Sequence, residues 1–411
     1  MRRWLEPIMR RFFVQGRLDI TWPDGSKTRF EGAAPGQHAA AALVGSSIVR
    51  RIMLHPAMAI GEGYMDGSIV PLGCSIYDVL DVLLANIVAT AETPPVMLRL
   101  RALGQRLTRR LAQRNQRGRA RRNVAHHYDI DGRIYDLFLD RDRQYSCAYF
   151  PRGDETLDQA QAAKKALVAA KLLLDRPDLE VLDIGSGWGG LALTLARECG
   201  ARVTGITLSA EQLGIARARA AAEGLAERVR FELADYRTLD RTFDRVVSVG
   251  MFEHVGVGHY DQFFEVVRRC LRPDGVALLH AIGRSDGPSV TNPWMAKYIF
   301  PGGYSPGLSE VLAPIERRGL IATDIEILRL HYARTLRLWR ERFVAARDEV
   351  LASHDERFFR MFEFYLAGSE LAFRRKDHMV FQIQLARRLD AVPFTRDYLF
   401  GSPAPYLAAA D

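Results

Sequence analysis

The chain has 411 residues, of which 48% are hydrophobic and 26% charged, a composition typical of a folded globular protein whose length suggests two domains. No apolar run reaches the roughly 18 uncharged residues that a membrane-spanning helix needs, and the four cysteines form no C-x-x-C pair. These features exclude a spanning helix and argue against a zinc site, a disulfide framework and a secretory signal. The net charge of +8 leaves nucleic acid or an anionic membrane open as a partner.

The N-terminal segment combines helical and strand patterns. Apolar residues at helical spacing predict a helix over Met1–Val14, whose other face is basic, and such a helix either lies on a lipid interface or docks on its own domain. Alternating residues predict a hairpin of Arg17–Trp22 and Lys27–Phe30, and helical patterns follow near Ala39–Leu54 and Tyr77–Ala91. We therefore expect residues 1–103 to form a small α+β domain that interacts with lipid or with a partner.

An arginine-rich stretch follows this segment, with ten arginines between Arg99 and Arg122. Such a run binds nucleic acid, binds an anionic membrane surface, or is a solvated linker. Attraction to anionic lipid contributes about 1 kcal/mol per basic residue, which keeps the membrane interpretation open. We expect residues 104–122 to be a basic linker, and we expect no nucleic-acid partner.

Strands and helices alternate in the remaining residues, 123–411. After an alanine-rich helix at Leu157–Asp175, the pattern predicts strands at 179–184, 202–206, 229–233, 243–249 and 276–282, with helices at 189–199, 210–223 and 260–270. A long helical insert, Tyr332–Phe373, separates two late strands at Ile321–Leu328 and Met379–Leu385. This order predicts an α/β fold, Rossmann-like, with a seven-stranded, mostly parallel sheet between helices.

A glycine loop marks the expected cofactor site of this sheet. Residues Val181–Gly190 read VLDIGSGWGG, so that an apolar strand runs through Asp183, Gly185 and Gly187 into a helix. Glycines let a ligand approach the backbone, and a helix N-terminus offers free N–H groups to an anion.

The residues around the loop favour S-adenosylmethionine over a dinucleotide. The glycine spacing lacks the third glycine of the dinucleotide pattern, and no acidic residue ends the second strand, where NAD sites place one. Thr207 stands at that strand end, Gln212 lies one helical turn further and is positioned to reach ribose hydroxyls, and Asp235 and Tyr236 offer a carboxylate and an aromatic plane to adenine.

Several longer strings resemble one known family. They are NVAHHYD at 123–129, QYSCAYF at 144–150, GITLSAEQ at 205–212, VGMFEHVG at 249–256, LLHAIG at 278–283, KYIFPGG at 297–303 and HYARTLRLW at 331–339. The set is similar to the cyclopropane-fatty-acyl-phospholipid synthases and their mycolic acid relatives, and it spans about two-thirds of the chain. GEGYMDG at 61–67 resembles longer bacterial members more loosely.

The resemblance implies a class I methyltransferase fold and a reaction. The methyl group of S-adenosylmethionine is transferred to a cis double bond of an unsaturated phospholipid acyl chain, and a bound bicarbonate ion takes a proton from the carbocation so that a cyclopropane closes. It further implies a cytoplasmic enzyme peripheral to the inner face of the membrane, which acts at an anionic membrane surface, and a possible homodimer.

The resemblance also assigns residues. The bicarbonate cage would consist of Cys147, Glu253, His280, the Ile282 backbone and Tyr332, with Glu253 orienting the bicarbonate hydroxyl. The matching cofactor-binding residues are Tyr145, Ser146, Gly185, Gly187, Thr207, Gln212 and Tyr236, to which the residue pattern adds Asp183 and Asp235. Arg237 stands where some family members have an acid.

Plain structural roles compete with these assignments. Outside its motif, Cys147 reads as an inert buried thiol, His280 as a core histidine in an apolar strand and Tyr332 as a core residue. His126 and His127 lack the partner spacing of a metal site, so we expect no metal. Alternative functions are a C-methyltransferase that gives a methyl-branched or methylene chain, and a non-catalytic lipid-binding relative.

Overall fold

The computed structural model of the protein describes residues 2–90 and 132–400. The arginine-rich stretch, the expected linker at 104–122, the boundary at residue 103 and the pair His126 and His127 lie outside the described residues. The described residues form two compact units. The first contains residues 2–90, 290–301 and 336–377, and the second contains 132–289, 302–335 and 378–400. Most of the helical insert therefore belongs to the first unit.

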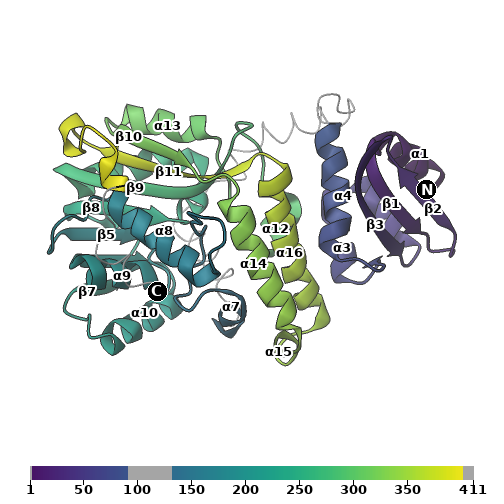
Figure 1. The fold of residues 1–411 in the computed structure, drawn as a ribbon, viewed down its shortest axis with the longest axis horizontal. Coiled ribbons are helices and arrows are strands. Elements are labelled where there is room, and N and C mark those ends of the chain that lie inside the picture. Colours follow the sequence, from purple (N-terminus) through teal and green to yellow (C-terminus); the bar gives the residue numbers. More distant parts are fainter. Residues whose placement is uncertain (1, 91–131, 401–411) are drawn as a thin grey trace. The chain divides into compact units, whose positions relative to one another are not determined.

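A seven-stranded sheet forms the centre of the second unit (Figure 1). Its strands are β5 (Glu180–Ile184), β6 (Arg202–Thr207), β7 (Val229–Leu233), β8 (Phe243–Val249), β9 (Leu271–Arg284), β10 (Ile321–Ile327) and β11 (His378–Ala386). The order is β10-β11-β9-β8-β5-β6-β7, and only the pairs of β11 with β9 and β10 are antiparallel. The expected Rossmann-like fold with a mostly parallel sheet is confirmed.

Helices cover both faces of this sheet, and each face has its own core. The helices of the second unit are α7 (Gly132–Phe138), α8 (Leu157–Lys171), α9 (Gly190–Cys199), α10 (Ala210–Ala222), α11 (Tyr260–Cys270) and α13 (Leu308–Arg317). Helices α8, α9 and α10 share one buried cluster with Val181 and Val203, whereas α11 and α13 share another with Leu182 and Ile206. Neighbouring strand residues face opposite cores, as the pleat of a strand requires.

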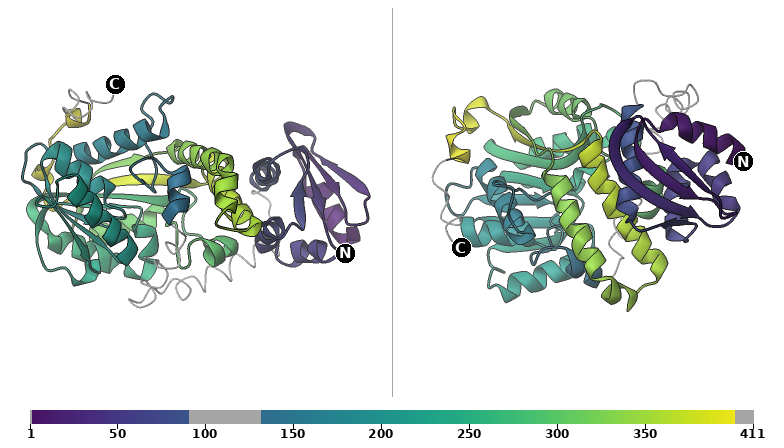
Figure 2. Two further views of the ribbon diagram at one scale, coloured as in Figure 1. Left: turned by 90° about the horizontal axis from the view of Figure 1, so that it is seen from below. Right: turned by 45° about the vertical axis from the view of Figure 1, so that its right-hand side comes forward.

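A mixed four-stranded sheet organises the first unit. Strands β1 (Gln15–Thr21), β2 (Lys27–Glu31), β3 (Ala34–Leu43) and β4 (Ile69–Pro71) lie in the order β2-β1-β3-β4. Helix α4 (Ile76–Ala89) packs on β3 and β1, as the two views in Figure 2 show. Its remaining helices are α1 (Arg2–Phe12), α2 (Ser47–Leu54), α3 (Pro56–Met65), α12 (Pro293–Tyr298), α15 (Arg347–Leu351) and α16 (Glu356–Arg375). The expected small α+β region is present, with its hairpin at β1 and β2.

One expected helix is wrong in its first half. The segment Ala39–Leu54 forms the end of strand β3 followed by helix α2, although its alanines favour a helix. Strand β3 pairs with β1, opposite Leu18 and Ile20, and Ala39 and Ala41 are each 1% exposed. The sheet partner decides the conformation, because local propensity is a weak preference that tertiary contacts override.

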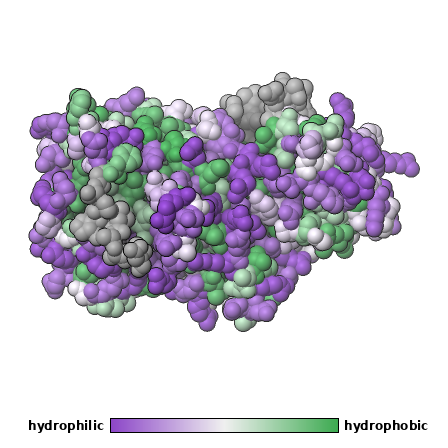
Figure 3. Space-filling view, viewed as in Figure 1, coloured by the Kyte–Doolittle hydropathy of each residue, from purple (hydrophilic) through white to green (hydrophobic). Residues whose placement is uncertain are grey.

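The expected helical insert is divided into three helices. Helix α14 (His331–Ala345) crosses from the second unit into the first, and α15 and α16 follow it. Among the described residues, no helix is both long enough and apolar enough to cross a bilayer. Hydrophilic residues dominate the face in Figure 3, where hydrophobic residues gather in separate patches.

Candidate cofactor and methyl-transfer site

The glycine loop joins β5 to α9 at the carboxyl edge of the parallel sheet, where open α/β sheets place ligands. Gly185 and Gly187 have φ angles of 88° and 53°, a region that favours glycine. A Cβ on Gly185 would lie 2.7 Å from the Met251 Cβ, whereas a Cβ on Gly187 would meet no described atom within 4 Å. The loop therefore packs tightly against Met251, after β8, at Gly185 and leaves space for a ligand at Gly187.

Asp183 gives this loop a buried carboxyl group. The residue is 2% exposed, and its Oδ2 has no hydrogen-bond partner among the described residues. Burial raises the pKa of Asp183 to about 7, and the charge of Lys164 offsets part of that effect. An unpartnered buried acceptor suits a ligand that brings its own donor, such as the amino group of S-adenosylmethionine.

The end of β6 holds Gln212 in a fixed orientation. The Thr207 hydroxyl donates to Gln212 Oε1 at 3.0 Å, and Ser209 caps α10 by accepting from the Gln212 N–H at 3.2 Å. Since Oε1 is engaged, the side-chain NH₂ of Gln212 is left to face a ribose acceptor.

The end of β7 brings Asp235 and Tyr236 together with Arg237. Both oxygens of the Asp235 carboxylate accept from the Arg237 guanidinium, at 2.8 and 2.6 Å. The Tyr236 ring packs edge-on against Phe263 with centroids 5.4 Å apart. The arginine that departs from the family's acidic pattern is thus the ion-pair partner of the neighbouring acid.

The segment 144–150 places Tyr145, Ser146 and Cys147. The Tyr145 ring packs edge-on against Tyr135 with centroids 5.3 Å apart. The Cys147 thiol is 1% exposed and donates to the Ala148 carbonyl at 3.3 Å. Burial raises the pKa of Cys147 far above its usual range, so the group remains a thiol and does not act as a nucleophile.

Glu253, just past the end of β8, contacts Ile282 near the end of β9. The Ile282 N–H donates to Glu253 Oε1 at 2.6 Å, while Oε2 has no hydrogen-bond partner among the described residues. Burial raises the pKa of Glu253 to about 7, against a smaller opposite effect of the Ile282 N–H. The carboxyl therefore has one oxygen fixed by the backbone and one oxygen available to a ligand.

His280 lies in the buried middle of β9 and is neutral. Burial lowers the pKa of His280 to about 3, with a smaller contribution from the charge of Lys164. The Gln382 amide lies 3.1 Å from Nδ1. With that amide donating, the neutral ring carries its hydrogen on Nε2, which makes Nε2 a donor.

The beginning of α14 anchors Tyr332 near the 144–150 segment. The Phe150 N–H donates to His331 Nδ1 at 3.0 Å, and the Ala148 N–H donates to Thr335 Oγ1 at 3.1 Å. These two contacts flank Tyr332, which is 7% exposed. The same segment approaches the end of β8, because a Cβ on Gly250 would lie 3.9 Å from the Ser146 Cβ.

These contacts bring the sequence-predicted residues together in two groups. Glu253 contacts Ile282, and His280 pairs with Val249 at the end of β8. Cys147 and Tyr332 lie on two segments that Ala148, Phe150, His331 and Thr335 hold together. Gly250 connects the groups, since its N–H donates to the His280 carbonyl at 2.9 Å and it neighbours Ser146.

The aromatic residues around this site have different roles. Phe252 is fully buried and stacks on Tyr260 with centroids 4.4 Å apart, so it belongs to the core and is not free to line a pocket. The Tyr304 N–H donates to the Glu253 carbonyl at 2.9 Å. Phe150 lies beneath the Arg334 guanidinium at 4.9 Å. Tyr304 is therefore held beside Glu253, and Phe150 is held in the segment that carries Cys147.

Sequence reasoning missed two buried polar residues of α8. Gln161 and Lys164 are both 0% exposed, and both bind the segment that carries Ser146. The available signal was the spacing of polar residues on the buried face of an alanine-rich helix.

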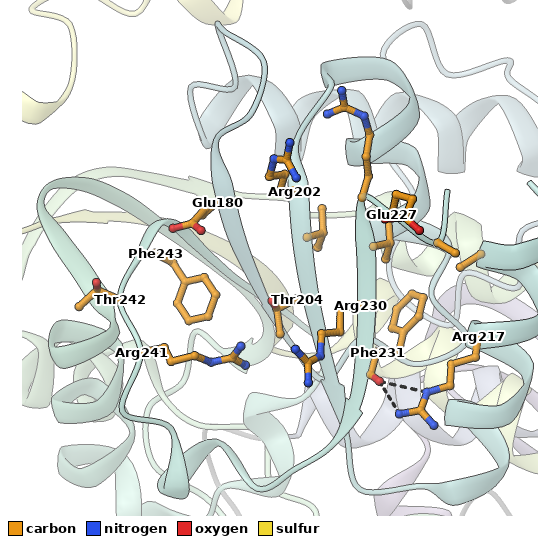
Figure 4. Close-up of a pocket in the computed structure, with 15 residues that line it drawn as sticks. Glu180, Arg202, Thr204, Arg217, Glu227, Arg230, Phe231, Arg241, Thr242 and Phe243 are labelled. Carbon is orange, nitrogen blue, oxygen red and sulfur yellow. Dashed lines mark hydrogen bonds between the residues drawn. The ribbon is translucent and has the colours of Figure 1, made fainter. Parts of the chain in front are cut away.

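A separate pocket lies at the opposite, amino ends of the strands (Figure 4). Its basic side chains are largely paired: Arg202 with Asp178 at 3.2 Å, and Arg241 with Glu232 at 3.0 Å. Arg217 donates to the Phe231 carbonyl at 2.8 Å. This pocket has no part in the constellation around the glycine loop.

The chain is similar to known proteins of one family. Residues 115–383 match the model of the mycolic acid cyclopropane synthetase family. The cyclopropane-fatty-acyl-phospholipid synthase of Escherichia coli K12 is 38% identical over 83% of this chain and 86% of its own. The tuberculostearic acid methyltransferase UfaA1 of Mycobacterium tuberculosis H37Rv is 36% identical over 92% and 90%.

Solved structures of cyclopropane synthases are also similar to this chain. The cyclopropane synthase MmaA2 of Mycobacterium tuberculosis has a TM-score of 0.62 at 34% identity and covers 65% of this chain and 98% of that one. A mycolic acid cyclopropane synthase, CmaA1, in complex with SAH and CTAB, has a TM-score of 0.61 at 34% identity, with coverages of 64% and 97%. The chain belongs to the mycolic acid cyclopropane synthetase family, and it is an S-adenosylmethionine-dependent methyltransferase of the cyclopropane synthase type.

Proposed function

We propose that this family member transfers the methyl group of S-adenosylmethionine to a cis double bond in an acyl chain of an unsaturated phospholipid and closes a cyclopropane ring there. The observation that carries the proposal is Glu253, a buried carboxyl with Oε1 fixed by the Ile282 N–H and Oε2 unpartnered among the described residues. The 38% identity to the E. coli cyclopropane-fatty-acyl-phospholipid synthase supports the choice of substrate.

The proposed reaction consists of methyl transfer followed by ring closure. A carbon–carbon bond forms between the methyl group and one alkene carbon, and the carbon–sulfur bond breaks to leave S-adenosylhomocysteine. The resulting carbocation on the lipid loses one proton from the new methyl group, and that electron pair closes the ring. A bicarbonate ion held by the residues of the cage would supply the base for this proton, a role that requires correct placement rather than a strong base.

We assign the bicarbonate cage to residues of both groups. Glu253 Oε2 accepts from the bicarbonate hydroxyl, and His280 donates from Nε2 to a bicarbonate oxygen. Cys147, Tyr332 and the Ile282 backbone complete the cage. The Cys147 thiol keeps its proton, and His280 has its Nδ1 lone pair engaged by the Gln382 amide and an N–H at Nε2, so neither residue offers a free base to the carbocation.

We assign the cofactor to the residues of the glycine loop and its neighbours. Gly185 and Gly187 give the ligand access to the backbone, and Asp183 Oδ2 accepts from its amino group. Gln212, held by Thr207, contacts the ribose, and Asp235 and Tyr236 contact the adenine. Tyr145 and Ser146 bind from the opposite side.

The aromatic side chains near the site protect the cation from water. Phe150, Tyr304 and Tyr332 are buried, and their faces stabilise a positive charge without forming a bond to it. Exclusion of water also prevents capture of the cation as an alcohol.

The test is turnover by the purified protein on vesicles of a mono-unsaturated phospholipid with S-adenosylmethionine. We expect each modified chain to gain the mass of one CH₂ and to lose its alkene reactivity. Absence of turnover in a protein that binds S-adenosylhomocysteine would contradict the proposal and favour a non-catalytic lipid-binding relative.

A second candidate function is formation of a methyl-branched or methylene chain. The 36% identity to a tuberculostearic acid methyltransferase over 92% of the chain favours it. Both reactions begin with the same cation, and the same product analysis separates them. A methylene chain forms by a hydride shift and loss of a proton, and it retains alkene reactivity. A saturated branched chain carries two hydrogens more than a ring, so its formation needs a hydride donor, such as a reduced nicotinamide, added to the assay.

We also propose that the enzyme is cytoplasmic and binds the anionic inner face of the membrane through α1. Trp4 and Ile8 of α1 are 73% and 58% exposed, one helical turn apart. Arg3 and Arg11 are exposed on the same helix and have no ion pair among the described residues. The division into residues 1–103, 104–122 and 123–411, with an acyl-chain-binding helical insert, and the homodimer remain predictions.

A further inference from the structure

Helix α8 buries an unusual set of polar side chains. Gln161, Lys164 and Lys171 are 0% exposed and Lys165 is 8% exposed, in a helix otherwise rich in alanine. A buried ammonium group is costly unless hydrogen bonds or opposite charges compensate for the loss of water. The partners of each lysine therefore show what the burial accomplishes.

Lys164 donates hydrogen bonds to the segment that precedes Cys147. Its Nζ donates to Gln144 Oε1 at 2.5 Å and to Ser146 Oγ at 3.0 Å. One turn earlier, Gln161 Nε2 donates to the Ser146 carbonyl at 2.9 Å. Helix α8 thus holds both the backbone and the side chain of Ser146.

The chemistry of the ammonium group fixes the direction of the Ser146 hydroxyl. Burial lowers the pKa of Lys164 to about 8, so the group is protonated at pH 7. A protonated lysine has three donors and no acceptor, so Ser146 Oγ accepts from Lys164 and its own hydrogen points elsewhere. Ser146 stands beside Gly250 at the end of β8, on the site side of the segment. Its hydroxyl is therefore prepared as a donor.

The charge of Lys164 also reaches the glycine loop. It lowers the pKa of the Asp183 carboxyl below the value that burial alone would give, and it does the same to the Cys147 thiol. Asp183 has a buried oxygen without a partner among the described residues, and the loop that follows it is open at Gly187.

We propose that Lys164 is a positioning residue for cofactor binding: it orders Ser146 as a hydrogen-bond donor to S-adenosylmethionine. The inference depends on the cofactor and not on the lipid. Wild-type protein that binds S-adenosylhomocysteine without lipid turnover would overturn the proposed reaction and leave this inference testable.

The experiment measures the dissociation constant of S-adenosylhomocysteine by calorimetry for Lys164→Met, Ser146→Ala and the double variant. Loss of one hydrogen bond to a charged or polar ligand group predicts roughly tenfold weaker binding in each single variant. Since both act through one hydroxyl, the double variant is expected to bind about as weakly as Lys164→Met alone. Losses that multiply independently would overturn the coupling.

Lys171→Met is the matched control, because Lys171 lies on the same helix, is equally buried and pairs with Glu326 instead. We expect it to lower thermal stability and to leave the dissociation constant unchanged. Lys164→Gln, which retains a shorter donor, covers the case that Lys164→Met does not fold, and we expect it to weaken binding less than Ser146→Ala. If Lys164→Gln, or a folded Lys164→Met, binds as the wild type does, Lys164 is structural only and the proposal fails.

Discussion

At the scale of single residues, the site is a set of buried groups that lack part of their hydrogen bonding. Asp183 and Glu253 each keep one oxygen without a partner among the described residues, and burial raises the pKa of both to about 7. Both groups would be satisfied by a ligand that brings donors. An unliganded site of this kind costs stability, which is common where function requires an unsatisfied group.

The raised pKa of Glu253 predicts a pH-dependent gain in stability for Glu253→Gln. The native carboxyl binds its proton more tightly than the unfolded one, whose pKa is 4.5, so wild-type stability falls as pH rises from about 4.5 to 7. Glutamine removes this loss. We expect the free energy of unfolding at pH 8 to rise by on the order of 3 kcal/mol in the variant, and to differ little at pH 4.

Urea unfolding of both proteins at the two pH values checks this expectation. Glu265→Gln is the control, because Glu265 is 46% exposed at its side chain on α11. A gain of equal size at pH 4 and pH 8 would show that ionisation of Glu253 is not its cause.

Glu253→Gln separates catalysis from cofactor binding in the same protein. The amide retains an acceptor for the Ile282 N–H but orients the bicarbonate poorly, so turnover is expected to fall roughly a hundredfold or more. The dissociation constant of S-adenosylhomocysteine should stay within a factor of about two. Parallel loss of both quantities would refute the role assigned to Glu253.

The same residues show what sequence can predict at this scale. The strings at 249–256 and 278–283 follow or lie on neighbouring strands, so their nearness at one sheet edge follows from the strand order. The string at 144–150 lies outside the strands, and its approach to Gly250 is a tertiary contact. Lys164 and Gln161 act through contacts 18 and 15 residues away. A lysine in an alanine-rich helix reads as a solvated residue until its burial is known.

At the scale of elements, the parallel strands were the most predictable part. Strands β7 and β8 have the expected bounds, since β7 alternates apolar and charged residues and β8 contains three valines, both typical of strands. Strand β3 was not predictable, because the alanines from Ala39 to Ala42 fit either a helix or a closely packed strand. The partner β1, rather than the local sequence, decides between them.

Helix α1 is the element on which the membrane proposal is tested. Trp4 and Ile8 offer exposed apolar surface beside the cations of Arg3 and Arg11, the combination that binds a lipid interface. We expect Trp4→Ala/Ile8→Ala to weaken binding to vesicles with anionic lipid roughly tenfold, measured by co-sedimentation. Raising the salt concentration should weaken wild-type binding, because exposed charges are screened.

The control for α1 is an exposed apolar residue whose neighbouring arginine is ion-paired. Leu389 is 77% exposed, and its neighbour Arg388 is paired with Asp390. Leu389→Ala is expected to bind vesicles as the wild type does. Vesicle binding that ignores both the α1 substitutions and the salt concentration would contradict a membrane role for this helix.

At the scale of the whole molecule, the first unit is built from distant parts of the chain. Its core includes Leu18, Ile20 and Val79 from the N-terminal residues together with Ala367 and Leu371 from α16. Deleting residues 1–103 would therefore expose the apolar face of α16 as well as remove α1. Truncation confounds loss of lipid contact with loss of packing, and substitutions on α1 are the cleaner test.

The ion pair of Asp81 with Arg375 provides the last prediction, because it joins α4 to the end of α16 across 294 residues of sequence. The carboxylate is 8% exposed and accepts two hydrogen bonds from the guanidinium, at 2.6 and 2.9 Å. Asp81→Asn leaves the Arg375 guanidinium without its charge partner and is expected to lower the free energy of unfolding by about 2 kcal/mol. The expected loss is below that of a fully buried pair because Arg375 is 36% exposed at its side chain.

Chemical unfolding measures the loss, and calorimetry with S-adenosylhomocysteine should find unchanged affinity, because the described cofactor residues all belong to the second unit. Unaltered stability would mean that apolar packing alone holds the two parts of the first unit together.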